Sequence, residues 1–142
     1  NISEGEGRQA TRNMFEQAGN FLIAKINWAV SGAQSVNETG SYGSKLSVNK
    51  VKSLNSAGQP VVTAVTISLP EPGDVLIENG TSGPYALNNA NVSVARLGFY
   101  HVLASGNGID PERVEASTTL TAYAPSGALM SEDFSTVVYV RH

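Results

Sequence analysis

The chain of 142 residues contains no cysteine. This absence excludes disulfide bridges, thiolate metal sites and cysteine nucleophiles, because each of them needs a thiol. Charged residues are also scarce, at 15% of the chain, and the net charge is −3. The nine lysines and arginines are scattered along the sequence rather than clustered, which argues against nucleic-acid binding.

Long apolar runs are missing as well. No stretch approaches the roughly 20 apolar residues that a helix needs to cross a bilayer. The sequence begins with Asn1 rather than Met. We expect that processing or truncation removed a preceding segment, and ordinary loss of the initiator Met is the alternative interpretation.

The first quarter of the chain has the periodicity of a helix. Apolar residues recur at steps of three and four at Phe15, Ala18, Leu22, Ile26, Ala29, Ala33 and Val36. A second line, made of Met14, Phe21 and Trp28, repeats every seven residues beside the first. Together the apolar sets cover roughly 220° of the circumference, since successive residues are about 100° apart. The pattern predicts a long N-terminal helix over residues 1–36.

So wide an apolar arc raises the question of what covers it. A sheet can cover the face that carries Leu22 and Ile26, which leaves the side with Phe21 and Trp28. Either a partner protein covers these aromatic residues, or the sheet curls around the helix, or a loop near Tyr42 lies over them. We therefore name the line of Met14, Phe21 and Trp28 as candidates for a subunit interface.

After Gly40 the sequence is typical of strands. Runs rich in β-branched and aromatic residues read LSVNKV, VVTAVTISL, DVLIEN, NVSVARLGFYHV, VEASTTLTAY and FSTVVYV, with turn signals between them. No helical run separates these strands, which favours antiparallel pairing. The sequence thus predicts a single α+β domain over residues 1–142, in which the helix of residues 1–36 packs on an antiparallel sheet of about six strands within residues 40–142.

Residues that could carry out chemistry are few. His101 lies in a strand pattern and His142 ends the chain, and no motif places a serine nucleophile or a second histidine beside either of them. The loop NGIDPE offers Asn107, Asp110 and Glu112 as weak calcium candidates, because calcium prefers oxygen ligands. The spacing of an EF-hand is absent, however, and Asp before Pro commonly starts a turn. We expect no catalytic residue, no cofactor and no metal site.

The segment RQATRNMFEQAGNFLIAKINWAVSGAQSV resembles the soluble half of the N-terminal helix of type IV pilin-like proteins. It is most similar to minor pilins and to the pseudopilins of type II secretion. The later order VLIENG, YALN, NVSVARLGFYHV and FSTVVYVR also resembles this family, whose closing strand is matched here by Phe134, Thr136, Val138 and Arg141. The family's processing site lies outside this sequence, and the C-terminal disulfide of many pilins is impossible without cysteine.

The resemblance implies a pilin-like fold and a non-catalytic function as a structural subunit of a type IV pilus-like or pseudopilus filament. Its partners would be other pilin-like subunits of the same filament and the inner membrane. It implies a place in the bacterial cell envelope, in the inner membrane as a precursor and in a periplasmic or extracellular filament after assembly. About 20 to 30 mostly apolar residues behind a short basic leader would precede Asn1. A Met directly before Asn1 in the gene would contradict this expectation.

One alternative function remains open. The chain could be an adhesive or ligand-binding β-rich surface domain, which predicts a groove lined by exposed aromatic residues. Tyr85, Tyr100 and Tyr123 are the candidates for such a groove. The competing interpretation of these tyrosines is ordinary packing across strands, which we favour.

Overall fold

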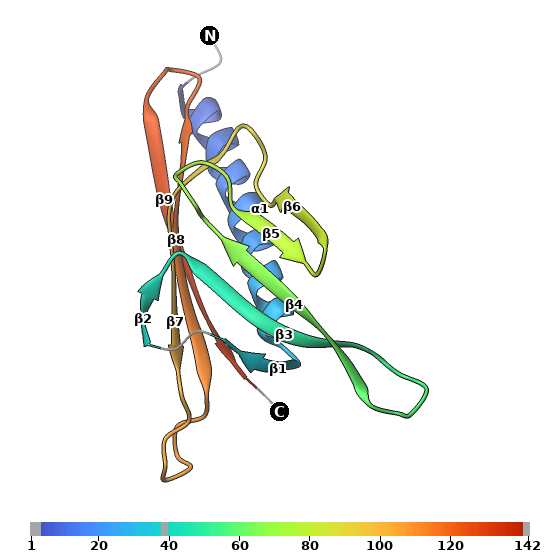
Figure 1. The fold of residues 1–142 in the computed structure, drawn as a ribbon. Coiled ribbons are helices and arrows are strands. Elements are labelled where there is room, and N and C mark those ends of the chain that lie inside the picture. The colour runs from blue at the N-terminus through green and yellow to red at the C-terminus, as the bar shows by residue number, and fades with distance from the viewer. Residues whose placement is uncertain (1–3, 38–39, 141–142) are drawn as a thin grey trace.

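The computed structural model describes residues 4–37 and 40–140. Within these residues the chain forms one helix, α1 (Glu4–Val30), followed by nine strands. The strands form two antiparallel sheets, and α1 runs beside them as a single long rod (Figure 1).

The two sheets draw their strands from separate parts of the chain. The five-stranded sheet has the order β1-β3-β4-β5-β6 and consists of β1 (Ala33–Val36), β3 (Lys45–Leu54), β4 (Pro60–Ser68), β5 (Leu76–Asn79) and β6 (Ser82–Ala86). The four-stranded sheet has the order β2-β7-β8-β9 and consists of β2 (Gly40–Gly43), β7 (Ser93–Val102), β8 (Arg113–Tyr123) and β9 (Leu129–Tyr139). The expected antiparallel pairing is confirmed in every strand pair.

The predicted fold class, a helix on one sheet of about six strands, is wrong. The molecule is mostly β, with two sheets, and three short strands were not foreseen. The sequences of β2 and β6, GSYG and SGPYA, hold glycine and proline and resemble turns. The chain then leaves β1, forms β2 against β7 and returns to form β3, and no local pattern reports such a switch between sheets.

The helix is also shorter than predicted, since it ends at Val30 and residues 33–36 form β1. Gly32 has a φ of 73°, a backbone conformation that other residues adopt with strain, and it separates the two elements. Ala33 and Val36 are both buried, as the helical pattern required. They share the core side of a strand because the register shifts between Ala33 and Ser35, and a bulge of this kind lets residues three apart face the same way.

The helix packs its apolar face on the strands. It contacts β8 and β9 of the four-stranded sheet and β1 and β3 of the other sheet. Leu22 and Ile26 are 3% and 1% exposed and belong to one core that includes residues of both sheets, so their predicted burial is confirmed. The helix lies close to β9 at Gly19, where an added Cβ would lie 2.6 Å from the ring of Phe134.

The Asn88 side chain forms hydrogen bonds with the loops where the two sheets meet. The Asn88 side chain accepts a hydrogen bond from the backbone N–H of Val75 and donates to the carbonyls of Gly73 and Val92, at 2.8, 3.0 and 2.7 Å. Gly73 also pairs with Val94 of β7 in an isolated bridge. These bonds tie the loops on either side of β5 and β6 to the start of β7.

One part of the five-stranded sheet projects from the body. β1 pairs with β3 only at residues 48–50, and β5 pairs with β4 only at residues 65–68. Beyond these residues β3 and β4 continue as a two-stranded ribbon, which we call the distal ribbon (residues 51–63). Its tip and the turn between β8 and β9 lie at opposite ends of the molecule (Figure 1).

Candidate functional site

The outer side of α1 is the candidate interaction surface. Phe21 and Trp28 are 50% and 42% exposed, although both are large apolar side chains. They lie seven residues apart on the helix, which places them about 10 Å apart along its axis, on one side. Their neighbours Leu22 and Ile26 are buried, so the predicted difference in burial between the two lines is confirmed.

Met14, the third member of the predicted line, has a different environment. It is partly buried and packs against the core. The exposed apolar surface of α1 is therefore concentrated at Phe21 and Trp28, toward the C-terminal half of the helix. Within the described residues, neither a sheet nor a loop covers these two aromatic side chains completely; the burial of Tyr42 lies outside the described part of the chain.

Two lysines lie beside the Trp28 ring. The Nζ atoms of Lys25 and Lys50 are 5.1 and 4.5 Å from its centroid, within the range of a cation–π interaction. The ring is thus held in place from two elements, α1 and β3, while much of its surface still faces solvent. A positioned, half-exposed aromatic side chain can contact a partner at a small cost in side-chain entropy.

Lys50 also closes the C-terminal end of the helix. Its ammonium group donates hydrogen bonds to the carbonyls of Trp28 and Ser31, the latter at 2.9 Å. The last turn of α1 has no basic residue of its own, so Lys50 supplies from β3 the positive charge that this end of a helix favours. Burial lowers the pKa of Lys50 below 10.5 because desolvation disfavours the charged form.

Two of the three weak calcium candidates, Asn107 and Glu112, use their side chains in other contacts. The Asn107 side chain accepts hydrogen bonds from Ser105 Oγ and from the backbone N–H of Ile109, the latter at 3.0 Å. Asp110 is exposed in the same turn, and Glu112 contacts His101. In the described part of the chain, no group of three histidines or acidic residues gathers in a way that could hold a metal ion.

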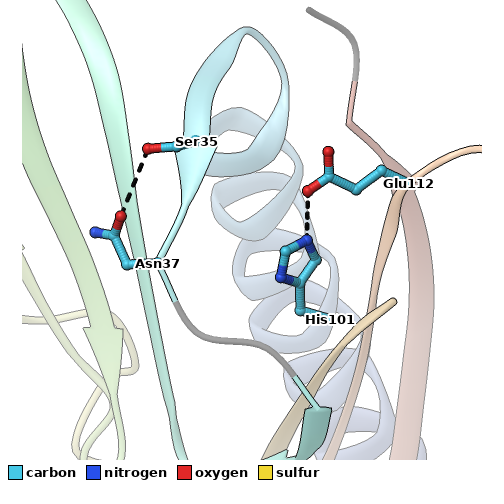
Figure 2. A network of polar contacts seen from close by, with 4 residues as sticks. All are labelled: Ser35, Asn37, His101 and Glu112. Carbon is cyan, nitrogen blue, oxygen red and sulfur yellow. Dashed lines mark hydrogen bonds and ion pairs between the residues drawn. The ribbon is translucent and has the colours of Figure 1, made fainter. Parts of the chain in front are cut away.

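The contact between His101 and Glu112 was not foreseen from the sequence. His101 is buried on β7 and Glu112 precedes β8, so the pair closes the base of the β7–β8 loop. Figure 2 shows the imidazole pointing toward the carboxylate, while Ser35 and Asn37 face each other apart from this pair. The geometry joins the ends of two strands, as expected for a structural histidine.

The three tyrosines proposed as a binding groove do not come together. Tyr85 lies on β6 of the five-stranded sheet, and Tyr100 and Tyr123 lie on β7 and β8 of the other. A surface hollow of about 400 Å³ is lined by Arg96, Leu97, Gly98 and Ser117, and none of the tyrosines lines it. Tyr85 and Tyr123 are 63% and 72% exposed, but on different sheets.

Sequence reasoning missed two features of the exposed surface. Lys50 and Trp28 are 22 residues apart in the chain, and no local signal joins them. The distal ribbon was predicted as ordinary strands, although four of its apolar side chains, Val51, Leu54, Val61 and Val62, are exposed. The length of β3 and β4 was a useful signal, because both are longer than their neighbours β1 and β5 and must extend beyond them.

The fold and this surface define a class: a helix-led β domain of two antiparallel sheets whose helix leaves an aromatic side uncovered. Comparisons with protein-family models, with curated proteins and with solved structures give no match. The helix in the described residues does not combine the length and apolar character that crossing a membrane requires.

Proposed function

We propose that this protein is a non-catalytic structural subunit of a pilin-like filament, and that its helix packs against neighbouring subunits through Phe21 and Trp28. The observation that carries the proposal is the exposure of these two side chains on a helix whose other face is buried. Burying half-exposed aromatic surface against a neighbour is favourable, at about 25 cal/mol per Å² of apolar area.

The sequence resemblance to type IV pilin-like proteins supplies the nature of the neighbour. In that family, helices of successive subunits lie beside one another, and a helix with two apolar sides suits such packing. Under this proposal a membrane-anchoring segment precedes Asn1, and the filament belongs to the bacterial cell envelope.

The test is a pair of adjacent substitutions on the helix. Phe21→Ser removes exposed apolar surface, so we expect the isolated domain to lose less than about 1 kcal/mol of stability. Leu22→Ser removes a buried side chain and buries a hydroxyl, which should cost more than about 3 kcal/mol. Urea unfolding of the 142-residue chain measures both effects.

Assembly is measured in parallel on the subunit expressed from its complete gene. We expect Phe21→Ser to abolish filaments although the domain folds, and the matched control Asn20→Ser, at an exposed polar position, to leave assembly intact. Filament formation by the Phe21→Ser subunit at the wild-type level would contradict the proposal. So would a loss of stability from Phe21→Ser equal to that from Leu22→Ser, since the aromatic side would then be ordinary core.

A further inference from the structure

The distal ribbon presents an apolar face to solvent. Val51 and Val62 are cross-strand partners and are 46% and 40% exposed; Leu54 and Pro60, also partners, are exposed further toward the tip. Pro60 and Val62 lie two residues apart on β4, so both pairs share one face. A two-stranded ribbon with exposed apolar side chains is only marginally stable alone, which favours burial against another surface.

A single positive charge lies within this face. The register shifts between Val51 and Ser53, and the extra residue of the bulge is Lys52. In a bulge two residues oppose one on the partner strand, so both Val51 and Lys52 lie opposite Val62. No acidic residue occurs between Lys45 and Pro70, and the charge of Lys52 is therefore uncompensated within the ribbon's own strands.

The opposite end of the molecule carries a complementary surface. Tyr123 and Leu129 are cross-strand partners next to the β8–β9 turn, and they are 72% and 61% exposed. Asp133 follows on the same face of β9, where it accepts a hydrogen bond of 2.7 Å from the Thr119 hydroxyl. No lysine or arginine occurs between Val114 and Val140. The helix, with its own arginines, packs on the other face of this hairpin, against Phe134.

The two surfaces match in layout. On each, an apolar cross-strand pair lies nearest the turn and a single charge lies further back along the strands. Asp133 is four residues from Leu129, about 14 Å along β9. Lys52 is only two residues from Leu54 on the ribbon, and its long side chain makes up the difference between the two spacings. Contact of a ribbon with a second ribbon would bring lysines together, and contact of two β8–β9 hairpins would bring aspartates together.

We propose that the distal ribbon of one copy docks on the outer face of the β8–β9 end of the next copy, with Lys52 paired to Asp133. The partner is a second copy of this chain, and the inference rests on the proposed filament function. The two surfaces are different parts of the chain at opposite ends of the molecule, so the contact is heterologous, and alignment of the two turns places neighbouring copies in opposite orientations (Figure 1). The contact uses none of the residues on the outer side of the helix.

The absence of cysteine makes disulfide capture a clean test. Ser56 in the ribbon turn and Ser126 in the β8–β9 turn are exposed and come together when the two surfaces align. We expect the Ser56→Cys and Ser126→Cys variants, mixed under mild oxidation, to form a mixed disulfide. The control mixture replaces Ser126→Cys with Ser31→Cys, an exposed position after the C-terminal end of α1, whereas the β8–β9 turn lies beside the N-terminal end of the helix, at Gly7. Equal rates in the two mixtures would overturn the proposal.

Charge reversal tests the pairing itself. Lys52→Glu in the Ser56→Cys copy should slow cross-linking about fivefold, since an exposed ion pair contributes at most about 1 kcal/mol. Asp133→Lys in the other copy should restore the rate. An unchanged rate with Lys52→Glu, or no recovery with the second reversal, would overturn the assigned pair.

The outcome separates this inference from the proposed function. Phe21→Ser should leave cross-linking of the 142-residue chain unchanged while preventing filament assembly of the complete subunit. Loss of assembly without any disulfide between positions 56 and 126 would refute the contact between the ribbon and the β8–β9 end and leave the proposed function standing. A disulfide together with normal assembly of the Phe21→Ser subunit would refute the proposed function and leave the contact between the ribbon and the β8–β9 end standing.

Discussion

The environment of Trp28 explains how a single residue can be both fixed and available. Its ring lies beside Lys25 and Lys50, and its carbonyl accepts a hydrogen bond from the Lys50 ammonium group. These interactions hold the C-terminal end of α1 against β3 without burying the ring. A neighbour would therefore meet an ordered side chain, and little conformational entropy would be lost on contact.

Replacing Lys50 tests this arrangement. Lys50→Gln loses two hydrogen bonds from a charged group at the helix end, and we expect a loss of about 1–2 kcal/mol in the free energy of unfolding. The matched control is Lys52→Gln, on an exposed part of the same strand, which should change stability by less than about 0.5 kcal/mol. Urea unfolding at pH 8 measures both variants, and equal stabilities would contradict the assigned role of Lys50.

The difference in stability between wild type and Lys50→Gln should also depend on pH. Burial lowers the pKa of Lys50 from 10.5, so between its folded-state pKa and 10.5 the unfolded chain binds more protons than the folded chain. The desolvation penalty of charged Lys50 is therefore complete below the folded-state pKa and disappears as the pH rises above 10.5. We expect the stability gap between wild type and Lys50→Gln to widen as the pH rises toward 10.5. A gap that narrows would show that the hydrogen bonds and the cation–π contact of the ammonium group outweigh its desolvation.

At the residue scale, the sequence pattern predicted side-chain exposure correctly where exposure depends only on the position of a residue around the helix. The periodicity separated Leu22 and Ile26 from Phe21 and Trp28 because positions three and four apart share a helical face. It could not show Lys50 beside Trp28, nor Glu112 beside His101, because those contacts depend on which strands become neighbours.

Among the elements, the contact between α1 and β9 is set by a small residue. Gly19 allows the helix to approach the Phe134 ring so closely that a methyl group has no room. A glycine inside a helix costs about 1 kcal/mol relative to alanine, so its presence here indicates a requirement of packing rather than of the helix.

We expect Gly19→Ala to destabilise the domain by about 1 kcal/mol. The gain in helix propensity is outweighed by displacement of the Phe134 ring, which overpacking usually makes cost about 1–3 kcal/mol. Combining Gly19→Ala with Phe134→Leu should recover part of the loss, because a smaller side chain leaves room for the methyl group. Thermal unfolding of the two single variants and the double variant measures this coupling. A stabilising Gly19→Ala would mean that the ring yields freely and that the contact is loose.

The segment of residues 33–36 shows why the helix end could not be placed from the sequence. A strand with a bulge and a continuing helix both put Ala33 and Val36 on the buried side, so the apolar spacing does not distinguish them. The glycine at position 32 was the available signal, since a residue with positive φ commonly follows a helix. The strands after residue 44 were easier to predict, because long runs of β-branched residues mark them directly.

On the scale of the whole molecule, the division into two sheets is the largest departure from the prediction. Strand identity follows from local composition, but the assignment of each strand to a sheet depends on long-range pairing, such as β2 with β7. The distal ribbon and the β8–β9 turn consequently belong to different sheets and project at opposite ends of the molecule (Figure 1). Arg141, the last residue of the pilin-like closing pattern, lies outside the described residues.

The central claim is that the outer side of α1 becomes buried between subunits, and the single tryptophan of the chain reports on this directly. Trp28 is 42% exposed in the isolated domain, so its fluorescence should shift to shorter wavelength and become protected from acrylamide when the complete subunit assembles into filaments. The 142-residue domain under the same conditions serves as the unassembled reference. Filaments in which the emission and quenching of Trp28 equal those of the isolated domain would contradict the account.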